Sequence, residues 1–150
     1  MSTHNEHNTD YRKTVLISSN KEDVFKALTE ELSNWWGTMD NIVQKKEDIF
    51  TVSWGEPWYK FKVVELNPFS IITWECIDCN QIIGDLEGVE KEWVGTRLQW
   101  EIKTIKHKEV EVSLIHQGLI PEFTCYKVCS SAWDSFIGTN LKDYLEGVNN

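Results

Sequence analysis

Apolar and polar side chains alternate along much of the chain from about residue 42 to 117, in the segments 49–54, 58–66, 70–76, 97–104 and 109–116. The pattern is clearest in the segments 97–104 and 109–116, where charged or polar residues separate the inward positions Leu98, Trp100 and Ile102, and then Val110, Val112, Leu114 and His116. Successive side chains of a β-strand point to opposite faces of a sheet, so this period of two predicts strands with one buried face. Short connections between the strands favour an antiparallel meander over a parallel sheet.

The residues before this region predict one strand and one short helix. Residues 11–18 form the expected first strand, and the sequence from Ser19 to Glu22 has the form of a capping box that opens a helix. The expected helix runs to Gly37, which can end it. Its apolar stripe consists of Val24, Phe25, Leu28 and Leu32.

Near the C-terminus the apolar period changes to that of a helix. The apolar flank consists of Tyr126, Cys129, Trp133, Phe136, Ile137, Leu141, Tyr144 and Leu145. A helix of about 20 residues spans about 30 Å, enough to cross a sheet. Gly138 weakens it by up to about 1 kcal/mol unless another group approaches closely there. The order of elements predicts an α+β fold with the last helix laid on the sheet.

Length and composition predict one globular domain. The chain has 150 residues, of which 41% are hydrophobic and 26% charged, enough for a sizeable core. Residues 1–10 are polar and without periodicity, so we expect a disordered tail there, with His4 and His7 in it, and a single domain over 11–150.

Charge and hydropathy exclude some classes of binding partner. Fifteen basic and twenty-four acidic residues give a formal charge of -9, which repels a phosphate backbone and argues against nucleic acid. No apolar run approaches the roughly 20 residues of a membrane span, and the first residues do not resemble a secretory leader. We therefore expect a cytoplasmic protein without membrane insertion, whose four cysteines are reduced thiols.

Several short segments together resemble the activator of heat-shock protein 90 ATPase homologue-like domains, part of the START-related and birch-pollen-allergen-like (SRPBCC) superfamily. They are Val24–Thr29, Trp35–Gly37, Gly95–Leu98, His116–Leu119, Trp133–Ile137 and Leu141–Leu145. The resemblance covers about residues 11–147 and implies a helix-grip fold. In that fold a curved antiparallel sheet of about six strands wraps around the long C-terminal helix, with one or two short helices after the first strand. An apolar cavity often lies between sheet and helix.

Eight tryptophans are many for a domain of this size. A concave sheet and a helix leave space that bulky side chains either fill or line. We expect the following residues to border a pocket for a small hydrophobic or amphipathic molecule: Trp36, Trp54, Phe61, Trp74, Trp100, His116, Trp133, Phe136 and Ile137. The alternative is that the same side chains pack solidly together as core.

The sequence gives weaker support for a metal site, for a catalytic histidine and for a functional acidic cluster. Four thiolates could bind zinc if the pairs Cys76/Cys79 and Cys125/Cys129 met, but buried cysteine is commonly a small hydrophobe, and we predict no metal site. His116 on an apolar face is either a proton acceptor or a satisfied core histidine. An acidic cluster in a loop reads as a solvated face, or else as a screen against anionic ligands. It comprises Asp85, Glu87, Glu90 and Glu92.

Three functions remain open at this point. The first is a non-enzymatic binding domain for a small hydrophobic molecule, with no cofactor. The second, implied by the resemblance, is a co-chaperone-like module that binds an ATPase chaperone and stimulates it. The third is an enzyme such as a cyclase, dehydratase or hydrolase that uses the same cavity; neither catalytic residues nor a cofactor fingerprint support it. The sequence is compatible with a monomer or a homodimer.

Overall fold

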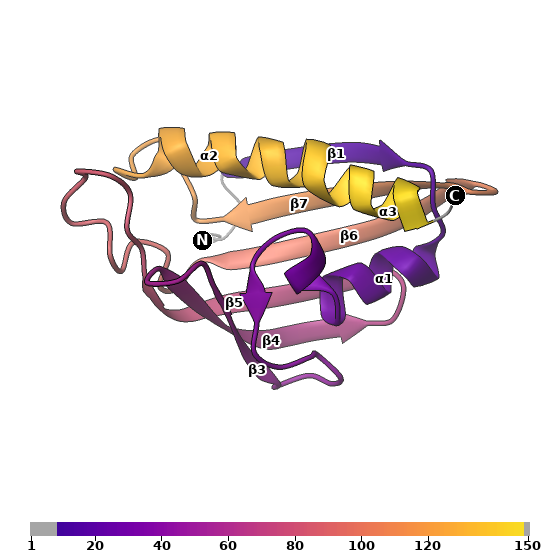
Figure 1. The fold of residues 1–150 in the computed structure, drawn as a ribbon, viewed down its shortest axis with the longest axis horizontal. Coiled ribbons are helices and arrows are strands. Elements are labelled where there is room, and N and C mark those ends of the chain that lie inside the picture. Colours follow the sequence, from indigo (N-terminus) through magenta and orange to yellow (C-terminus); the bar gives the residue numbers. More distant parts are fainter. Residues whose placement is uncertain (1–8, 149–150) are drawn as a thin grey trace, which may run out of the picture.

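A computed structural model describes residues 9–148, and these form one seven-stranded antiparallel sheet in the order β1-β7-β6-β5-β4-β3-β2 (Figure 1). The strands are β1 (Tyr11–Ile17), β2 (Thr38–Met39), β3 (Ile49–Ser53), β4 (Trp58–Asn67), β5 (Ile71–Asn80), β6 (Arg97–Lys106) and β7 (Glu109–Gln117). Five of these confirm strands expected from the alternation of residues 49–116 and one confirms the first strand. The two-residue β2 was not predicted, because so short a segment shows no period.

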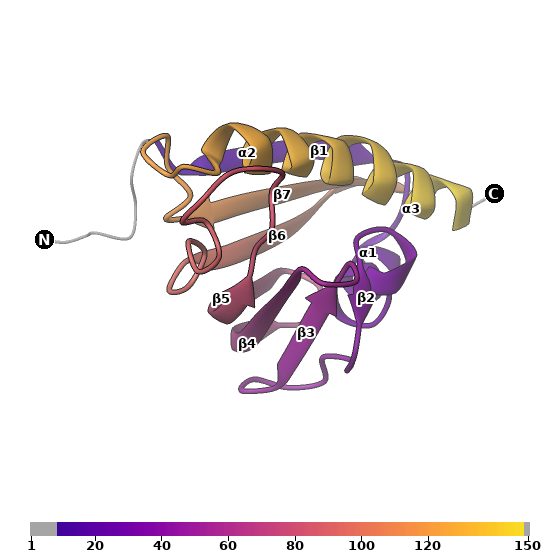
Figure 2. The same ribbon diagram turned by 60° about the vertical axis from the view of Figure 1, so that its left-hand side comes forward.

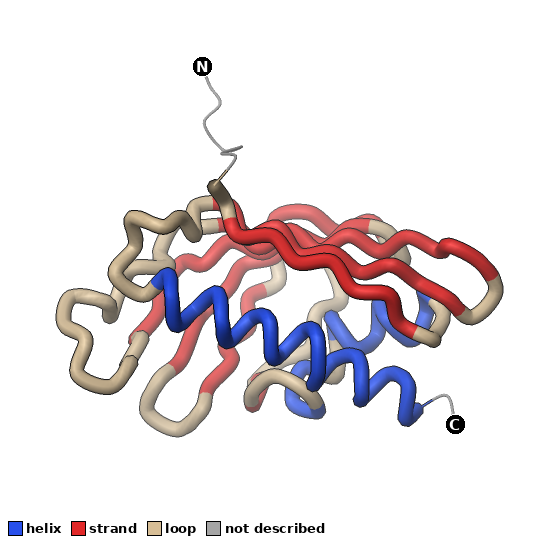
Figure 3. Tube along the Cα trace, turned by 90° about the horizontal axis from the view of Figure 1, so that it is seen from above, coloured by secondary structure: helices blue, strands red, loops and turns tan. Residues whose placement is uncertain are grey.

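Helices cover one face of the sheet. The short helix α1 (Lys21–Thr29) and the 3₁₀ turn η1 (Leu32–Asn34) follow β1. The C-terminal helix comprises α2 (Tyr126–Ser135), a π-helical segment η2 (Phe136–Leu141) and α3 (Lys142–Val148). The sheet curls around this long helix, as Figures 2 and 3 show from two sides, which is the predicted helix-grip arrangement. None of the described helices has the length and hydropathy that crossing a membrane requires.

The first helix is shorter than predicted and is capped by a different residue. Asn20, not Ser19, is the N-cap: its backbone is extended and its Oδ1 accepts a hydrogen bond of 2.7 Å from the Asp23 N–H. The helix ends at Thr29, whose hydroxyl donates to the Phe25 carbonyl. Leu32 therefore belongs to the separate η1 turn, although its side chain is buried as expected.

Alternation along the strands correctly identified the buried face. On β7 all four predicted inward residues, from Val110 to His116, are fully buried, and on β6 Leu98 and Trp100 are as well. The predicted tail lies largely outside the described residues. Asp10, at its end, is buried, and its carboxylate accepts a hydrogen bond from the Gly118 N–H.

Candidate functional site: an aromatic cavity under the C-terminal helix

A cavity of about 220 Å³ opens between the concave face of the sheet, the C-terminal helix and the loop 81–96. Its wall is formed mainly by aromatic and aliphatic side chains: Trp36, Trp54, Pro57, Tyr59, Ile82, Ile83, Trp93, Val128, Cys129, Ala132, Trp133 and Phe136. Ile82 and Val128 are each 46% exposed and therefore mark its rim. The loop contributes one side of that rim and α2 the other.

Trp133 of α2 is the central ring of the wall. Its ring lies 5.1 Å from that of Trp36 and 5.9 Å from that of Trp93, with interplanar angles of 27° and 19°. Both neighbouring indoles therefore stack on Trp133, and all three rings are part of the apolar wall. Phe136, one helical turn later, meets Trp54 at 6.3 Å and extends the same surface.

Trp36 and Trp54 lie close together because Gly37, which follows Trp36 in the chain, lets the Trp54 ring approach the backbone. The Trp54 indole N–H donates a hydrogen bond of 2.8 Å to the Trp36 carbonyl. Gly37 lies directly against the Trp54 ring: a Cβ there would come within 2.5 Å of the ring and 2.9 Å of Val52. Only glycine permits this approach, so the segment after η1 fixes the position of one wall of the cavity.

The sheet side carries a buried polar chain that starts at Tyr59. Its ring packs 4.4 Å from that of Trp93, and its hydroxyl donates a 2.7 Å hydrogen bond to the Gln81 Oε1. The Gln81 amide N–H in turn donates to the Val89 carbonyl. Burial raises the pKa of Tyr59 well above its ordinary value, so the phenol stays neutral and presents no charge to the cavity.

Cys129 adds a thiol to the same wall. Its Sγ accepts a hydrogen bond from the Trp93 indole N–H at 3.4 Å and donates one to the Gln81 Oε1 at 3.3 Å. A hydrogen bond with Cys125 lowers the pKa of Cys129, assisted by the one from Trp93, although burial acts in the opposite direction. The same contact, together with burial, raises the pKa of Cys125, so Cys129 is the more acidic thiol of this pair.

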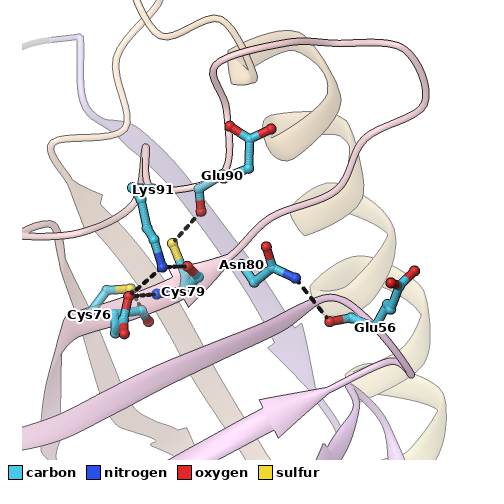
Figure 4. A network of polar contacts seen from close by, with 7 residues as sticks. Glu56, Cys76, Cys79, Asn80, Glu90 and Lys91 are labelled. Carbon is cyan, nitrogen blue, oxygen red and sulfur yellow. Dashed lines mark hydrogen bonds and ion pairs between the residues drawn. The ribbon is translucent and has the colours of Figure 1, made fainter.

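Polar contacts around Cys79 and Lys91 anchor the loop 81–96 to the end of β5 (Figure 4). The Lys91 ammonium donates to the Asp78 carboxylate at 2.8 Å and to the Cys79 carbonyl at 2.7 Å. The Cys79 thiol donates to the Glu90 carbonyl at 3.2 Å. The loop thus returns to the strand it left, with Ile82 and Ile83 in the part that projects over the cavity.

Glu92 departs from the expectation of a purely solvated acidic cluster. Its carboxylate accepts hydrogen bonds from the backbone N–H groups of Thr124 and Cys125, at 2.6 and 3.0 Å, immediately before α2. A carboxylate at this position satisfies free donors and complements the helix dipole. Glu92 therefore ties the loop to the helix, whereas Asp85, Glu87 and Glu90 are exposed side chains.

His116 is buried and bonded at both ring nitrogens. The Trp133 indole, which can only donate, gives a 3.2 Å hydrogen bond to Nδ1. The Nε2 lies 2.9 Å from the Thr96 hydroxyl, which itself donates to the Trp93 carbonyl at 2.7 Å, so Nε2 carries the proton. Burial lowers the pKa of His116 to about 3. It matches the satisfied core histidine of the two sequence interpretations.

The structure divides the nine predicted pocket residues into two groups. Trp36, Trp54, Trp133 and Phe136 line the cavity. The other five are fully buried in the adjoining packed core: Phe61, Trp74, Trp100, His116 and Ile137. The predicted residues are thus contiguous, but the cavity occupies only the end of the interior beneath the loop 81–96.

The sequence did not predict most of the cavity residues that lie in the loop 81–96 and at the rim. Trp93, Ile82 and Ile83 lie in a segment without periodicity, where no pattern indicates which side chains turn inward. Tyr59 carried a usable signal, because alternation along β4 places it on the same face as Phe61. Cys129 likewise stands on the apolar flank of the helix, one turn before Trp133.

All four cysteines are free and buried. Residues three apart on a strand normally point to opposite faces, but a register shift in the pairing of β4 with β5 brings Phe61 opposite Cys76 and Lys60 opposite Asp78. This bulge turns Cys76 and Cys79 to the same, buried side. Across residues 9–148, no group of three or more histidine, cysteine or acidic side chains has an arrangement that could hold a metal ion.

Comparisons with known proteins agree on the fold. No family model matches the chain, and no curated protein matches it by sequence. Among solved structures it is similar to Aha1 from Colwellia psychrerythraea, studied as a dimer, with a TM-score of 0.73 and 21% identity over 91% of this chain and 96% of that one. It is also similar to an HSP90 activator from Plasmodium falciparum, with a TM-score of 0.61 and 15% identity over 89% and 91% of the two chains.

A third similar structure comes from a biosynthetic context. DynU16, a protein of the dynemicin biosynthetic locus, matches with a TM-score of 0.70 and 16% identity over 93% of this chain, which spans 48% of DynU16. Identities this low carry the fold alone. The chain therefore has a helix-grip fold like that of Aha1 and of the HSP90 activator.

Proposed function

We propose that the chain binds a small, neutral, largely apolar molecule in the cavity beneath the C-terminal helix. The observation that supports this most directly is the cavity of about 220 Å³ with its aromatic wall. An apolar cavity of about 150 Å³ is large enough to bind benzene, so this volume suits a molecule of one or two rings. Its residues, foremost Trp36, Trp54, Trp133 and Phe136, are the proposed ligand contacts.

The polar groups of the wall favour a neutral ligand. The indole of Trp54, the hydroxyl of Tyr59 and the thiol of Cys129 all have protein partners. No lining side chain among the described residues is an acid, a lysine or an arginine. A charged ligand would lose its hydration without gaining a partner, whereas a flat aromatic ring would gain apolar contact with the aromatic wall.

A fluorescence titration tests the proposal. We expect 2-naphthol to change tryptophan emission saturably and the anion 2-naphthoate, of similar shape, to have no such effect. Ala132→Phe places a ring in the cavity and should abolish the response, because Ala132 is part of the wall. Ser131→Phe adds the same ring at the neighbouring exposed position and should leave the response intact. Equal binding by both variants, or equal responses to both compounds, would refute a cavity site for neutral ligands.

Binding of the chaperone HSP90 is a second candidate function. It is supported by the similarity of fold to an HSP90 activator and to Aha1. The direct measurement is the ATPase rate of purified HSP90 with and without the chain. Stimulation that persists in Ala132→Phe would separate a chaperone role from ligand binding.

The oligomeric state and the location of the protein are separate proposals. Light scattering of the purified chain decides between a monomer and a homodimer. The four free thiols support a cytoplasmic location, where thiols stay reduced.

A further inference from the structure

The wall of the aromatic cavity contains a polar spot, formed by the Tyr59 hydroxyl and the Cys129 thiol. Both groups are hydrogen-bonded to the same atom, the Gln81 Oε1, at 2.7 and 3.3 Å, so the phenol oxygen and the sulfur lie close together. Tyr59 and Cys129 line the cavity, whereas Gln81 is fully buried and is not among the described lining residues. The hydrogen-bond partner that the two groups share therefore lies behind the wall.

The buried amide of Gln81 fixes the direction of these hydrogen bonds. Its Nε2 donates to the Val89 carbonyl at 3.0 Å. The reverse orientation of the amide would place two carbonyl oxygens against each other, so the Oε1 must face Tyr59 and Cys129. An amide oxygen can only accept, and therefore both the hydroxyl and the thiol direct their protons at it.

With their protons directed at Gln81, both groups offer only lone pairs to a molecule in the cavity. The Tyr59 oxygen keeps its proton, because burial raises the pKa of the phenol well above its ordinary value. The Cys129 sulfur is a weak acceptor and already accepts from the Trp93 indole at 3.4 Å, which leaves the Tyr59 oxygen as the better acceptor. A ligand therefore forms a hydrogen bond with this spot only if it carries a donor.

Most indole donors of the wall already have protein partners. Four indoles line the cavity, and three of them donate their N–H groups to protein acceptors, namely those of Trp54, Trp93 and Trp133. A ligand that can only accept hydrogen bonds would therefore find few donors. A hydroxyl group suits the wall better, because it donates to Tyr59 and, as an acceptor, is also compatible with the N–H of the fourth indole, that of Trp36.

We propose, building on the proposed function, that the ligand is a neutral aromatic molecule with a hydroxyl group that donates a hydrogen bond to the Tyr59 oxygen. The hydroxyl must keep its proton, because the corresponding anion has no donor and would bring a charge into an apolar wall. An ammonium group has donors, but no carboxylate is among the described lining residues to balance its charge. Tyr59 is thus the residue that determines the chemical class of the ligand.

Two probes of similar shape test the preference for a hydroxyl. 2-Naphthol carries the donor and 2-fluoronaphthalene has a fluorine in its place; each is titrated against the full chain with tryptophan emission as the signal. The fluoro compound is less well hydrated, so a wall without a free acceptor would bind it more tightly. We expect 2-naphthol to bind at least as tightly. Tighter binding of 2-fluoronaphthalene would overturn the hydroxyl preference and leave the cavity site standing, whereas binding of neither compound would refute the proposed function as well.

Matched variants identify Tyr59 as the acceptor. Tyr59→Phe keeps the ring, so the affinity for 2-naphthol should fall about three- to tenfold with the loss of one hydrogen bond, and that for 2-fluoronaphthalene should stay the same. Tyr126→Phe removes a hydroxyl from a ring that is not among the described lining residues and should change neither affinity. An equal change for both probes in Tyr59→Phe would mean that the hydroxyl has a structural role, and an unchanged affinity for 2-naphthol would refute the contact. The comparison of the two probes on the unchanged chain decides the proposal even if Tyr59→Phe does not fold.

Discussion

At the scale of single residues, His116 shows how the fold fixes a protonation state. Its Nδ1 accepts from Trp133 and its Nε2 donates to Thr96, so a second ring proton would meet the Trp133 N–H. The imidazole is therefore neutral in the fold and joins the helix to β7 and to the loop. A general base needs a free acceptor nitrogen toward a substrate, and this ring has none to offer in the present arrangement.

The first prediction concerns the pH dependence of stability. The pKa of His116 is about 3 in the fold and about 6.5 when unfolded, so between these values the unfolded chain binds more protons. The free energy of unfolding should consequently fall as the pH falls below about 6.5, by up to about 1.4 kcal/mol per pH unit. Urea unfolding at pH 7, 6 and 5 measures this slope. His116→Gln should flatten it, and an equal slope in that variant would exclude His116 as its source.

The second prediction uses Cys129 as a reporter of the cavity. Cys129 is 5% exposed and lines the cavity, while the other three cysteines are fully buried, and the hydrogen bonds from Cys125 and Trp93 lower its pKa. Iodoacetamide should therefore modify Cys129 first, because the thiolate is the nucleophile. Saturating 2-naphthol should slow this reaction. Mass spectrometry of digests gives the rates, with Cys129→Ser as the control; uniform labelling of all four thiols would show that global opening governs access.

At the scale of elements, the C-terminal helix carries a spacing that a regular α-helix does not fit. Its buried residues recur every four positions at Cys129, Trp133, Ile137, Leu141 and Leu145. Four residues exceed one α-helical turn by about 40°, so over this length the buried stripe would rotate away from the sheet. The wider turns of the π-helical segment offset that drift. The segment begins at Phe136, so the same local change also sets the position of a cavity side chain.

The third prediction contrasts two glycines. A Cβ at Gly138 would meet only the end of the Lys13 side chain, at 3.6 Å, so Gly138→Ala should raise the free energy of unfolding by about 0.5–1 kcal/mol. Gly37→Ala should lower it by about 1–3 kcal/mol, because the new methyl group overlaps the Trp54 ring. Denaturant unfolding compares the two. A destabilised Gly138→Ala would mean that the π-helical segment requires the freedom of glycine.

Period alone identified the elements well and their ends less well. The strands have one buried face, so the alternation of apolar and polar residues predicts which side chains are buried, as on β7. The start of α1 depends on a local contact, the hydrogen bond that the Asn20 side chain accepts from the Asp23 N–H, whereas the sequence pattern predicted Ser19 as the capping residue. The bulge in β5 is likewise invisible in the sequence, since Cys76 and Cys79 read as opposite faces until the pairing is known.

At the scale of the whole molecule, the curved sheet and the helix leave an interior that is filled at one end and open at the other. Trp74 and Trp100 fill the centre, with their rings 5.7 Å apart. The sequence indicated which aromatic residues face inward, but not which of them pack solidly in the core and which line the cavity. The boundary between the packed core and the cavity depends on the loop 81–96, which brings Trp93 and Ile83 over the open end. The path of this loop could not be predicted, because its sequence has no periodicity.

Glu92 is one of the links between this loop and the helix, beside the hydrogen bonds of Cys129 with Trp93 and Gln81, and it gives the fourth prediction. Glu92→Gln weakens a charge-assisted cap on Thr124 and Cys125 and should lower the free energy of unfolding by about 1–2 kcal/mol. Amide hydrogen exchange should accelerate in residues 81–96 and in the first turn of α2, and 2-naphthol should dissociate faster because the rim opens more often.

Glu87→Gln is the matched control, since it removes the same charge from an exposed position in the same loop and should change stability by less than about 0.5 kcal/mol. If both variants exchange alike, the loop is held by its other contacts, such as those of Lys91 with β5, and not by Glu92. If only Glu92→Gln accelerates exchange and release, entry to the cavity is coupled to the start of the gripped helix. A change at the surface of that helix would then alter ligand affinity without any contact with the ligand.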